Sequence, residues 1–410
     1  MLNKNQEREL AYVVIIDEIR EIPGYDRVEH ARTGGWWCIV PKGQFHVGDA
    51  AIYFEIDSKV PPTNPAFAFL EKRNYKIKTQ KMCKVLSQGL IMHAEDFGWT
   101  TCEDEKNRPG ICIGDNKGYT FHYADDESRF LTKILGVTYA DEEDNKRKAN
   151  SVDKYKKMAQ RHPVLFRKPI VRWLMKRTWG KKLMFLFFGK KKDKKNGWPE
   201  WVTKTDEERI QNMPWILEDK GEWVVTEKID GSSTTFTMKR GKHNKYEFYV
   251  CSRNVCFDSV DKPCYYDTNI YWEMAQKYDM YNMLSAFLLE RSEIEWVTIQ
   301  GETFGAGVQK RDYSLEGHDF RAFNLITSDK GRWGTLEMKE ILEKHYHIPC
   351  VPVVLPSFKF EGFDIDKLLT FAEGNSMIDG KPREGFVFRS KDGQRSFKAV
   401  SNSFLLKYHG

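Results

Sequence analysis

Short apolar runs separated by turn residues occupy the first hundred residues of the chain. Apolar or β-prone runs at 10–16, 36–41, 51–56 and 81–92 alternate with stretches that contain glycine, proline and aspartate. Short strands at this regular spacing are typical of an antiparallel barrel or sandwich. The pattern therefore predicts a small β-rich domain at the N-terminal end.

After residue 200 the pattern changes to a mixture of strands and helices. Predicted strands are Trp223 to Thr226, Thr234 to Met238, Tyr246 to Ser252, Trp296 to Gly301, Phe320 to Ile326, Gly385 to Arg389 and Arg395 to Val400. Helical periodicity is present in Tyr265 to Glu290, Thr335 to Tyr346 and Ile365 to Ala372. Antiparallel sheets with flanking helices suit this order best, so we expect an α+β fold.

The length of 410 residues allows two or three domains. We divide the chain into an OB-like β-barrel domain at 1–100, a linker with a basic helical insertion at 101–200, and an antiparallel-sheet domain at 201–410. The strand pattern of the first domain fits an SH3-like barrel equally well.

The charge is distributed unevenly along the chain. The net charge is +6, yet residues 146–195 contain 19 Lys plus Arg and only two acidic residues. Aromatic and aliphatic residues are interleaved with these cations, and Pro169 and Gly180 divide the segment into short pieces. We interpret the segment as a nucleic-acid contact. A solvated linker and attachment to an anionic membrane surface are the alternatives.

Composition narrows the class of protein further. No apolar run approaches the ~18 residues needed to span a membrane, and the N-terminus has no apolar signal region. The eight cysteines form no CxxC pair, which argues against a zinc site. We expect a cytoplasmic monomer with free thiols.

Lys228 is the main candidate for chemistry. It ends a predicted strand in the sequence Lys228-Ile229-Asp230-Gly231, and another strand follows, so we expect a hairpin with the lysine at its mouth. Desolvation there would lower the lysine pKa and expose a nucleophilic amine. A KxDG string occurs by chance in roughly one chain in ten of this length, so a solvated hairpin lysine is the alternative.

Further polar groups lie at the ends of the strands that follow. In chain order they are Arg253, Glu302 between two glycines, the aromatic pair Phe320 and Phe323, Glu384 and Lys398. Each alone has an ordinary explanation, such as a surface ion pair, a local cap or a core aromatic. Together they match what adenylyl transfer from ATP needs: an amine, acids for Mg²⁺ and ribose, cations for phosphates and a platform for adenine.

With these residues the chain resembles the ATP-dependent RNA ligases, and most closely the Deinococcus-type group, in which an OB-like domain precedes the ligase domain. Matching strings are KTDEERIQN at 204–212, TEKIDGSS at 226–233, CSRN at 251–254, GETFGAGVQ at 301–309, FRAFNL at 320–325, REGFVFR at 383–389 and SFKAVSNSFLLKY at 396–408. IREIPGYDRVEHARTGGW, FHVGDAAIYFEIDSKVP and LSQGL match in the N-terminal part, whereas residues 141–198 have no counterpart.

The resemblance implies a covalent mechanism. Lys228 would take AMP from ATP, pass it to an RNA 5′-phosphate, and a 3′-hydroxyl would then displace AMP to seal the strand. Because the barrel could grip a helix, we expect the substrate to be the ends of RNA or of an RNA/DNA duplex, at nicks in duplex or structured nucleic acid. The implied roles are Asp230 and Glu384 for Mg²⁺ (or Mn²⁺), Glu227 for reading adenine, Phe323 for stacking on it, Glu302 for ribose, Arg253 and Lys398 for phosphate oxygens, and Arg209 for the triphosphate. A second lysine of the last motif is missing, and Arg395 or Lys407 would replace it.

Domain order separates this group from other KxDG enzymes. Capping-type guanylyltransferases and many DNA ligases carry an OB domain after the last motif, whereas only 12 residues follow Lys398 here. This favours an RNA ligase over a capping-type nucleotidyltransferase or a DNA ligase. The remaining alternative is an RNA-binding adaptor with an inactive ligase fold, but every position that the chemistry needs is present.

Overall fold

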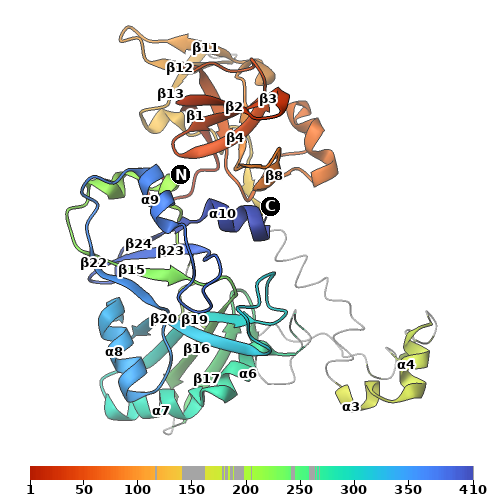
Figure 1. The fold of residues 1–410 in the computed structure, drawn as a ribbon, viewed down its shortest axis with the longest axis vertical. Coiled ribbons are helices and arrows are strands. Elements are labelled where there is room, and N and C mark those ends of the chain that lie inside the picture. Colours follow the sequence, from red (N-terminus) through yellow and green to blue (C-terminus); the bar gives the residue numbers. More distant parts are fainter. Residues whose placement is uncertain are drawn as a thin grey trace.

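In the computed structural model the chain folds into a β-rich unit and a larger sheet-and-helix unit below it (Figure 1). The structure describes residues 1–115, 118–140, 162–177, 180, 183–184, 188, 198–204, 206–241, 245–257, 264, 266 and 268–409. Most of the basic segment 146–195 lies outside these residues, and only the short helices α3 (Pro163–Phe166) and α4 (Pro169–Met175) are assigned bounds there.

The N-terminal unit is built from short antiparallel strands, as predicted. They are β1 (Ala11–Ile15), β2 (Glu18–Ile22), β3 (Tyr25–Thr33), β4 (Trp36–Pro41), β5 (Ala50–Phe54), β6 (Ser58–Lys59), β7 (Lys76–Ile77), β8 (Gln80–Met82), β9 (Val85–Ser87), β10 (Leu90–Met92), β11 (Thr100–Glu103), β12 (Pro109–Asp115), β13 (Gly118–Tyr123) and β14 (Thr138–Tyr139). The main sheets have the orders β1-β5-β10, β2-β3-β4 and β11-β12-β13.

Strand β5 shows why the sequence of this unit contains nearly continuous apolar runs. All five of its residues are buried, and alternate residues enter different cores. Ile52 and Phe54 pack in one core, whereas Ala51 and Tyr53 pack in the other. A strand that is buried on both faces needs apolar side chains at every position, because successive residues point to opposite faces.

The N-terminal core extends beyond residue 100. Ile111, Leu131 and Val137 pack in the same core as Phe54. These residues are widely spaced in a polar stretch, so their pattern did not indicate a buried face. We therefore propose that the N-terminal unit extends to about residue 140.

The C-terminal unit contains two antiparallel sheets. Its strands are β15 (Trp223–Lys228), β16 (Ser232–Arg240), β17 (Tyr246–Ser252), β18 (Cys256–Phe257), β19 (Trp296–Gly305), β20 (His318–Thr327), β21 (Gly331–Arg332), β22 (Val353–Phe358), β23 (Gly385–Ser390) and β24 (Ser396–Val400). Its helices are α6 (Ile270–Lys277), α7 (Met280–Glu290), α8 (Thr335–His345), α9 (Ile365–Ala372) and α10 (Asn402–Phe404). The sheet orders are β22-β15-β23-β24 and β18-β17-β16-β19-β20-β21.

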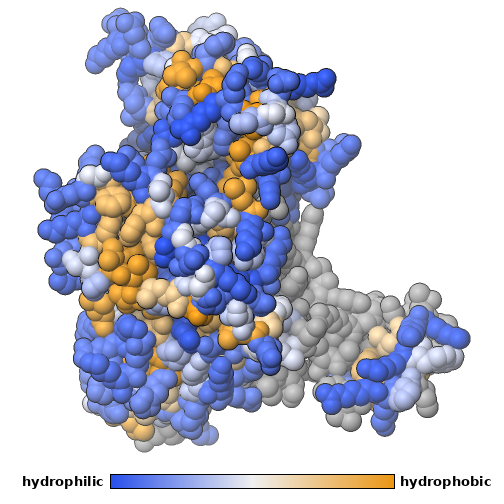
Figure 2. Space-filling model, in the orientation of Figure 1, coloured by the Kyte–Doolittle hydropathy of each residue, from blue (hydrophilic) through white to orange (hydrophobic). Residues whose placement is uncertain are grey.

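Each sheet has its own core. Side chains of the six-stranded sheet pack with α6, α7 and α8, including Phe236, Leu284 and Leu342. The four-stranded sheet packs with α9 through Phe388 and Leu368. Figure 2 shows apolar side chains exposed over β22, the partly exposed edge strand of this sheet. No helix in the described ranges is long and apolar enough to cross a membrane.

Two sequence predictions about elements differ from the structure. The helix expected at 265–290 is divided into α6 and α7, because Asp279 between them has a left-handed conformation (φ 45°). Strand β22 was not predicted. It contains Pro356, which cannot donate a backbone hydrogen bond and is therefore tolerated only at a sheet edge.

The hairpin expected around Lys228 is wrong. Strand β15 pairs with β22 and β23, whereas β16 pairs with β17 and β19 in the other sheet. Residues 229–231 therefore cross from one sheet to the other. Gly231 is required at this crossing, since a Cβ there would lie 2.4 Å from the Thr303 carbonyl oxygen. Lys228 consequently lies where the two sheets meet.

The close approach of β19 and β20 gives a stability prediction. A Cβ at Gly301 would lie 2.3 Å from Cζ of Phe320 and 2.4 Å from the Arg321 carbonyl oxygen. Overpacking of this kind costs about 1–3 kcal/mol. We expect Gly301→Ala to lower the free energy of unfolding by about 2 kcal/mol in urea titrations. The control is Gly317→Ala, where the added Cβ meets no atom within 4 Å. Equal stabilities of the two variants would contradict the prediction.

Several contacts join the two units. Glu55, buried in the N-terminal unit, accepts hydrogen bonds from Arg8 (3.0 Å) and from Asn212 of the C-terminal unit (3.4 Å). Arg32 pairs with Asp366 at 2.7 Å. Hydrogen bonds and an ion pair therefore connect the N-terminal unit to the C-terminal unit.

Candidate active site

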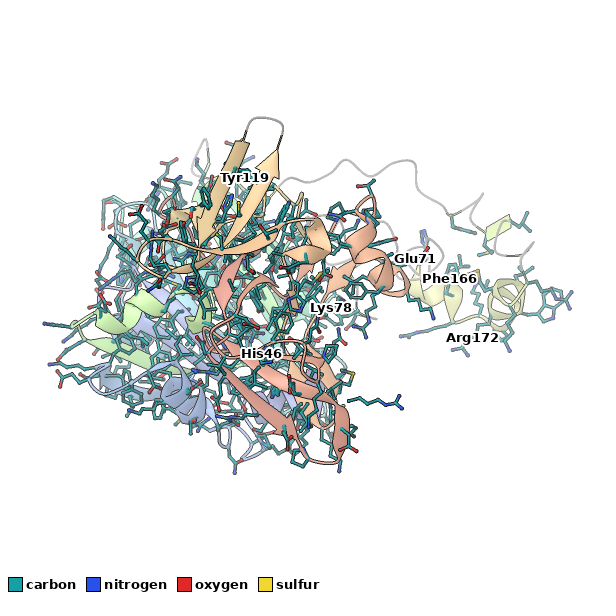
Figure 3. The ribbon with its side chains drawn as sticks, turned by 90° about the horizontal axis from the view of Figure 1, so that it is seen from above. His46, Glu71, Lys78, Tyr119, Phe166 and Arg172 are labelled. Atoms are coloured by element: carbon teal, nitrogen blue, oxygen red, sulfur yellow. The ribbon has the colours of Figure 1, made fainter. Side chains whose placement is uncertain are left out.

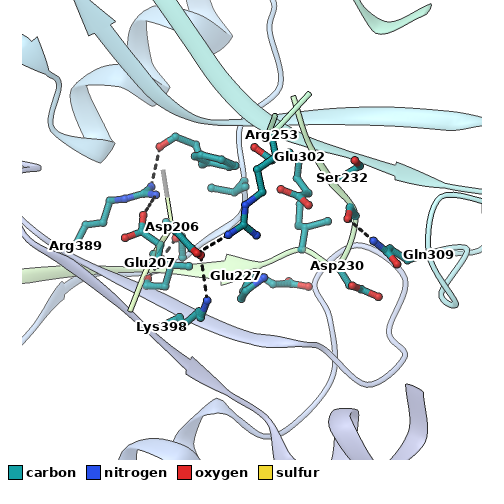
Figure 4. A pocket seen from close by; sticks show the side chains of 18 residues that line it. Asp206, Glu207, Glu227, Asp230, Ser232, Arg253, Glu302, Gln309, Arg389 and Lys398 are labelled. Carbon is teal, nitrogen blue, oxygen red and sulfur yellow. Dashed lines mark hydrogen bonds and ion pairs between the residues drawn. The ribbon is translucent and has the colours of Figure 1, made fainter. Parts of the chain in front are cut away.

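A cavity of about 350 Å³ lies where the two sheets meet (Figure 4). Seven of the nine predicted site residues line it: Glu227, Lys228, Asp230, Arg253, Glu302, Phe323 and Lys398. They come from both sheets. Strands β15 and β24 belong to the four-stranded sheet, and β17, β19 and β20 belong to the six-stranded sheet. The crossing at 229–231 is what brings these two groups of strands together.

Lys228 is held by an ion pair with Glu384. Its Nζ lies 2.8 Å from Glu384 Oε2, because the pairing of β15 with β23 places Lys228 opposite Gly385. Burial alone would lower the pKa of Lys228, but Glu384, Glu302 and Asp230 together raise it above its usual value. The expected lowering of this pKa is therefore wrong, and the charged ammonium is favoured.

Glu302 faces the same lysine from β19. Burial raises the pKa of Glu302 to about 8, although Lys228 acts to lower it, and the charges of Glu384 and Asp230 raise it further. The protonated form of Glu302 is therefore favoured at neutral pH. Three carboxyl groups, those of Glu384, Glu302 and Asp230, therefore act electrostatically on Lys228.

Arg253 and Lys398 form the cationic side of the cavity. Asp206 pairs with both: its Oδ2 lies 2.6 Å from Arg253 Nη2, and its Oδ1 lies 3.5 Å from Lys398 Nζ (Figure 4). Burial acts to raise the pKa of Asp206, but the charges of Lys398 and Arg253 lower it overall. The two cations that are expected to bind phosphate are therefore both paired with the Asp206 carboxylate.

Phe323 is positioned by a residue that the sequence analysis did not include. Arg389 donates a hydrogen bond to the Phe323 carbonyl oxygen at 2.7 Å, and its guanidinium lies 5.6 Å from the Phe323 ring centroid. Arg389 is in turn paired with Glu207 at 2.8 Å. Phe320, the other aromatic candidate, is fully buried in the core of the six-stranded sheet.

Glu227 forms the floor of the cavity beside Lys228. Its Oε2 accepts a hydrogen bond from the Met377 backbone N–H at 2.7 Å. Its Oε1 is buried and has no hydrogen-bond partner within the described part of the chain. A buried oxygen without a donor costs about 1–3 kcal/mol, so this atom favours a ligand that supplies an N–H or O–H group.

Comparisons with known proteins agree with this geometry. A family model described as RNA ligase matches residues 221–409, and a model described as an OB-fold domain matches residues 10–94. Residues 221–409 thus form an RNA ligase domain. The OB-fold match confirms the expected OB-like fold of the N-terminal part. A search of curated proteins found no match.

Solved RNA ligase structures match nearly the whole chain. Naegleria gruberi RNA ligase with pyrophosphate is 25% identical with a TM-score of 0.62, and covers 98% of this chain and 99% of its own. A mutant of that ligase with ATP and Mn is 26% identical with a TM-score of 0.63, covering 98% and 100%. A mutant with AMP and Mn is 26% identical with a TM-score of 0.64, covering 98% and 99%.

The loop between β19 and β20, in which Arg311 and Tyr313 are buried, supports the RNA ligase site from behind. The Asp230 backbone N–H donates to the Tyr313 hydroxyl at 2.7 Å, and Gln309 donates to the Gly231 carbonyl oxygen at 2.9 Å. Arg311 donates to the Pro382 carbonyl oxygen at 2.6 Å and pairs with Asp379. One loop therefore holds both the KxDG crossing and the segment that leads to Glu384.

Three predicted cations do not line the cavity. The Arg209 guanidinium lies 5.8 Å from the Trp36 ring of the N-terminal unit, and its triphosphate role stays a prediction. Arg395, one candidate for the missing second cation, pairs with Asp219. Lys407, the other, is likewise absent from the lining.

Four residues of the site were not predicted from the sequence, and the reason is the same for all of them. Asp206 and Glu207 belong to the matched string at 204–212, but the acidic residues of that string carry no sign of which cation they meet. Arg389 and Tyr313 lie in a strand and a loop whose partners are distant in the chain. The roles of these residues depend on tertiary contacts, which the local sequence pattern does not show.

The carboxylates suit a hard divalent cation. Mg²⁺ usually binds one or two protein carboxylates and retains several waters. Among the residues described here, no three His, Cys, Asp or Glu are grouped closely enough to hold an ion by themselves. Asp230 and Glu384, beside a lysine and a third carboxyl group, fit the looser arrangement of one or two protein ligands.

Proposed function

We propose that this chain is an ATP-dependent RNA ligase that joins a 3′-hydroxyl to a 5′-phosphate through AMP bound covalently to Lys228. The observation that carries the proposal is the position of Lys228, which lines one cavity together with the phosphate-binding candidates Arg253 and Lys398. The volume of about 350 Å³ lies within the range of small-ligand sites. The Naegleria structures with ATP, AMP and pyrophosphate support the choice of nucleotide.

The reaction has three displacements at phosphorus. The Lys228 ammonium first loses its proton, and the neutral amine attacks the α-phosphate of ATP, forming a P–N bond as pyrophosphate leaves. A 5′-phosphate oxygen of RNA then displaces the lysine and takes the AMP. Finally the 3′-hydroxyl loses its proton, attacks the activated 5′-phosphate, and releases AMP as the ends are joined.

The other residues bind and orient the nucleotide. Phe323 would stack on adenine, and Glu227 Oε1 would accept a hydrogen bond from its amino group. Protonated Glu302 can both donate to and accept from a ribose hydroxyl. Phosphate oxygens would compete with Asp206 for Arg253 and Lys398.

Asp230 and Glu384 would hold the divalent cation. When bound, this cation would offset negative charge on the α-phosphate and favour the neutral amine of Lys228. The same carboxylates favour the ammonium of Lys228 when no cation is present.

We further propose that the substrate is a nick in duplex or structured RNA. The support is the N-terminal OB-fold match together with the basic segment 146–195, which we expect to contact nucleic acid. Deletion of 146–195 should then weaken RNA binding and leave lysine adenylylation nearly unchanged.

The test combines covalent labelling with sealing assays. Incubation with ATP labelled at the α-phosphate and Mg²⁺ should label the protein, and label that survives alkali but is released by acid or by acidic hydroxylamine indicates a P–N bond. Sealing is then measured on nicked duplexes and single-stranded ends, each made with RNA or DNA on either side of the junction. A protein that labels but seals only DNA nicks, or that never labels, contradicts the proposal.

A further inference from the structure

A strongly basic stretch outside the cavity has no part in the chemistry described so far. Residues 72–84 contain six cations and no acidic residue. They are Lys72, Arg73, Lys76, Lys78, Lys81 and Lys84. All of these side chains except Lys76 are exposed. Lys78 lies on the same side of the N-terminal unit as Glu71 (Figure 3). We call residues 72–84 the basic ridge.

Most charges of the basic ridge are not neutralised by the protein. Across the described residues, Lys72, Arg73, Lys78 and Lys84 form no ion pair within 4 Å, although exposed lysines elsewhere commonly do. Lys330, for example, pairs with Glu337. Like charges grouped without acids repel one another, and a negatively charged partner would relieve this repulsion.

The hairpin β8–β9 places the ridge beside the cavity. The Leu86 carbonyl oxygen lies 2.8 Å from His30 Nε2, and the Ile39 backbone N–H donates to Ser87 Oγ at 3.0 Å. On its other side Leu86 packs with Val400 and Leu405 of the C-terminal unit. The hairpin is therefore held between the two units.

Strand β24 gives the separation from the active site. Val400, which meets Leu86, lies two residues beyond Lys398, which lines the cavity. Residues two apart in a strand share a face and lie about 7 Å apart. The ridge hairpin thus borders the end of the cavity at which the cations lie.

The turn of the β8–β9 hairpin determines where Lys81 and Lys84 lie. Cys83 and Lys84 both have left-handed conformations, with φ of 54° and 64°, as a two-residue hairpin turn of this kind requires. Lys81 pairs across the hairpin with Leu86, so both lie on one face. Lys81 Nζ accordingly reaches the Leu406 carbonyl oxygen at 3.1 Å. Lys84 is at the exposed tip.

We propose that the basic ridge binds the phosphate backbone of the nucleic-acid strand whose end lies in the cavity. Lysines act as point charges on phosphates and carry no base preference, which suits an enzyme that seals ends of varied sequence. The ridge would hold the nucleic-acid strand close to Lys398, since Val400, which meets the hairpin, is two residues from Lys398 along β24. This inference rests on the proposed function, since it assumes a polynucleotide substrate.

The test uses the full chain with Lys78→Gln, Lys81→Gln and Lys84→Gln combined. Binding of a nicked RNA duplex is measured by fluorescence anisotropy at several salt concentrations, and lysine adenylylation is measured in parallel. We expect the Kd to rise roughly tenfold or more at low salt, and the salt slope to fall by about two to three, because three phosphate contacts are lost. Labelling with AMP should stay unchanged.

The matched control changes three paired lysines far from the ridge: Lys330→Gln, Lys344→Gln and Lys391→Gln. Their carboxylate partners are Glu337, Glu340 and Glu222. Net charge falls by the same amount, so a Kd change under about twofold is expected if position matters. A second ridge variant, Lys72→Gln with Lys78→Gln and Lys84→Gln, spares the Lys81 contact and should weaken binding similarly.

The outcomes separate the two proposals. If the ridge variants bind RNA with the wild-type Kd and salt slope, or no more weakly than the control, the ridge inference is wrong while the ligase proposal stands. If the wild-type protein takes no AMP label, the ligase proposal fails first.

Discussion

Lys228→Met is expected to lower covalent AMP labelling by at least about a thousandfold, to the background of the assay. Methionine preserves the length of the side chain but has no amine that could form the P–N bond. Lys228→Arg should fail as well, because a guanidinium stays protonated and is a poor nucleophile. The measurement is label on the protein after incubation with α-labelled ATP and Mg²⁺.

The control for Lys228→Met is Lys239→Met on the neighbouring sheet. Lys239 also pairs with a carboxylate, at 3.0 Å from Glu295, but lies outside the cavity. It should keep wild-type labelling. Labelling that persists in Lys228→Met, in a protein of normal thermal stability, would place the AMP on another residue.

The second large effect is expected for Glu384→Gln, which we predict to slow lysine adenylylation roughly ten- to a hundredfold at saturating ATP. The substitution removes one of the two carboxylates proposed to hold the divalent cation. The metal concentration that gives half of the maximal rate should therefore rise. Rates are measured by single-turnover labelling over a range of Mg²⁺ and Mn²⁺ concentrations.

The pH dependence of the same variant tests the electrostatics of the site. Glu384 raises the pKa of Lys228, so the ammonium persists to higher pH and the adenylylation rate should increase with pH. At a divalent-cation concentration that saturates the variant, removing the Glu384 charge lowers the pKa of Lys228, and the rising part of the pH–rate profile should move to lower pH. Glu295→Gln, which removes the partner of Lys239, should leave the profile unchanged. A shift of the profile to higher pH would contradict the assigned ion pair.

Much of the fold was predictable because its periodicity is local. Helix α9 was expected at 365–372 and occurs there, since its buried Leu368, Leu369 and Ala372 repeat at helical spacing. The strands around Lys228, Arg253 and Glu302 were also expected, because β-branched and aromatic residues dominate them. Pattern could not show that β15 and β16 belong to different sheets, since strand pairing depends on distant segments.

The candidate site divides in the same way. Glu227, Asp230, Phe323 and Lys398 were recognised from short strings of matched residues, and all four line the cavity. Asp206, Arg389 and Tyr313 were not, because each acts through a partner that is far away in the chain. The positive charge of the basic ridge at 72–84 is visible in the sequence, but its position near Lys398 depends on the tertiary structure.

By itself the sequence determined which elements form and which residue types are available for adenylyl transfer, because periodicity and short motifs are local properties of the chain. Only the tertiary structure decided that Lys228 lies where the two sheets meet, that carboxylates raise its pKa, and that Asp206 pairs with both Arg253 and Lys398. These features depend on distances between segments up to about two hundred residues apart. Electrostatic interactions are set by such distances and by burial, neither of which the order of residues states.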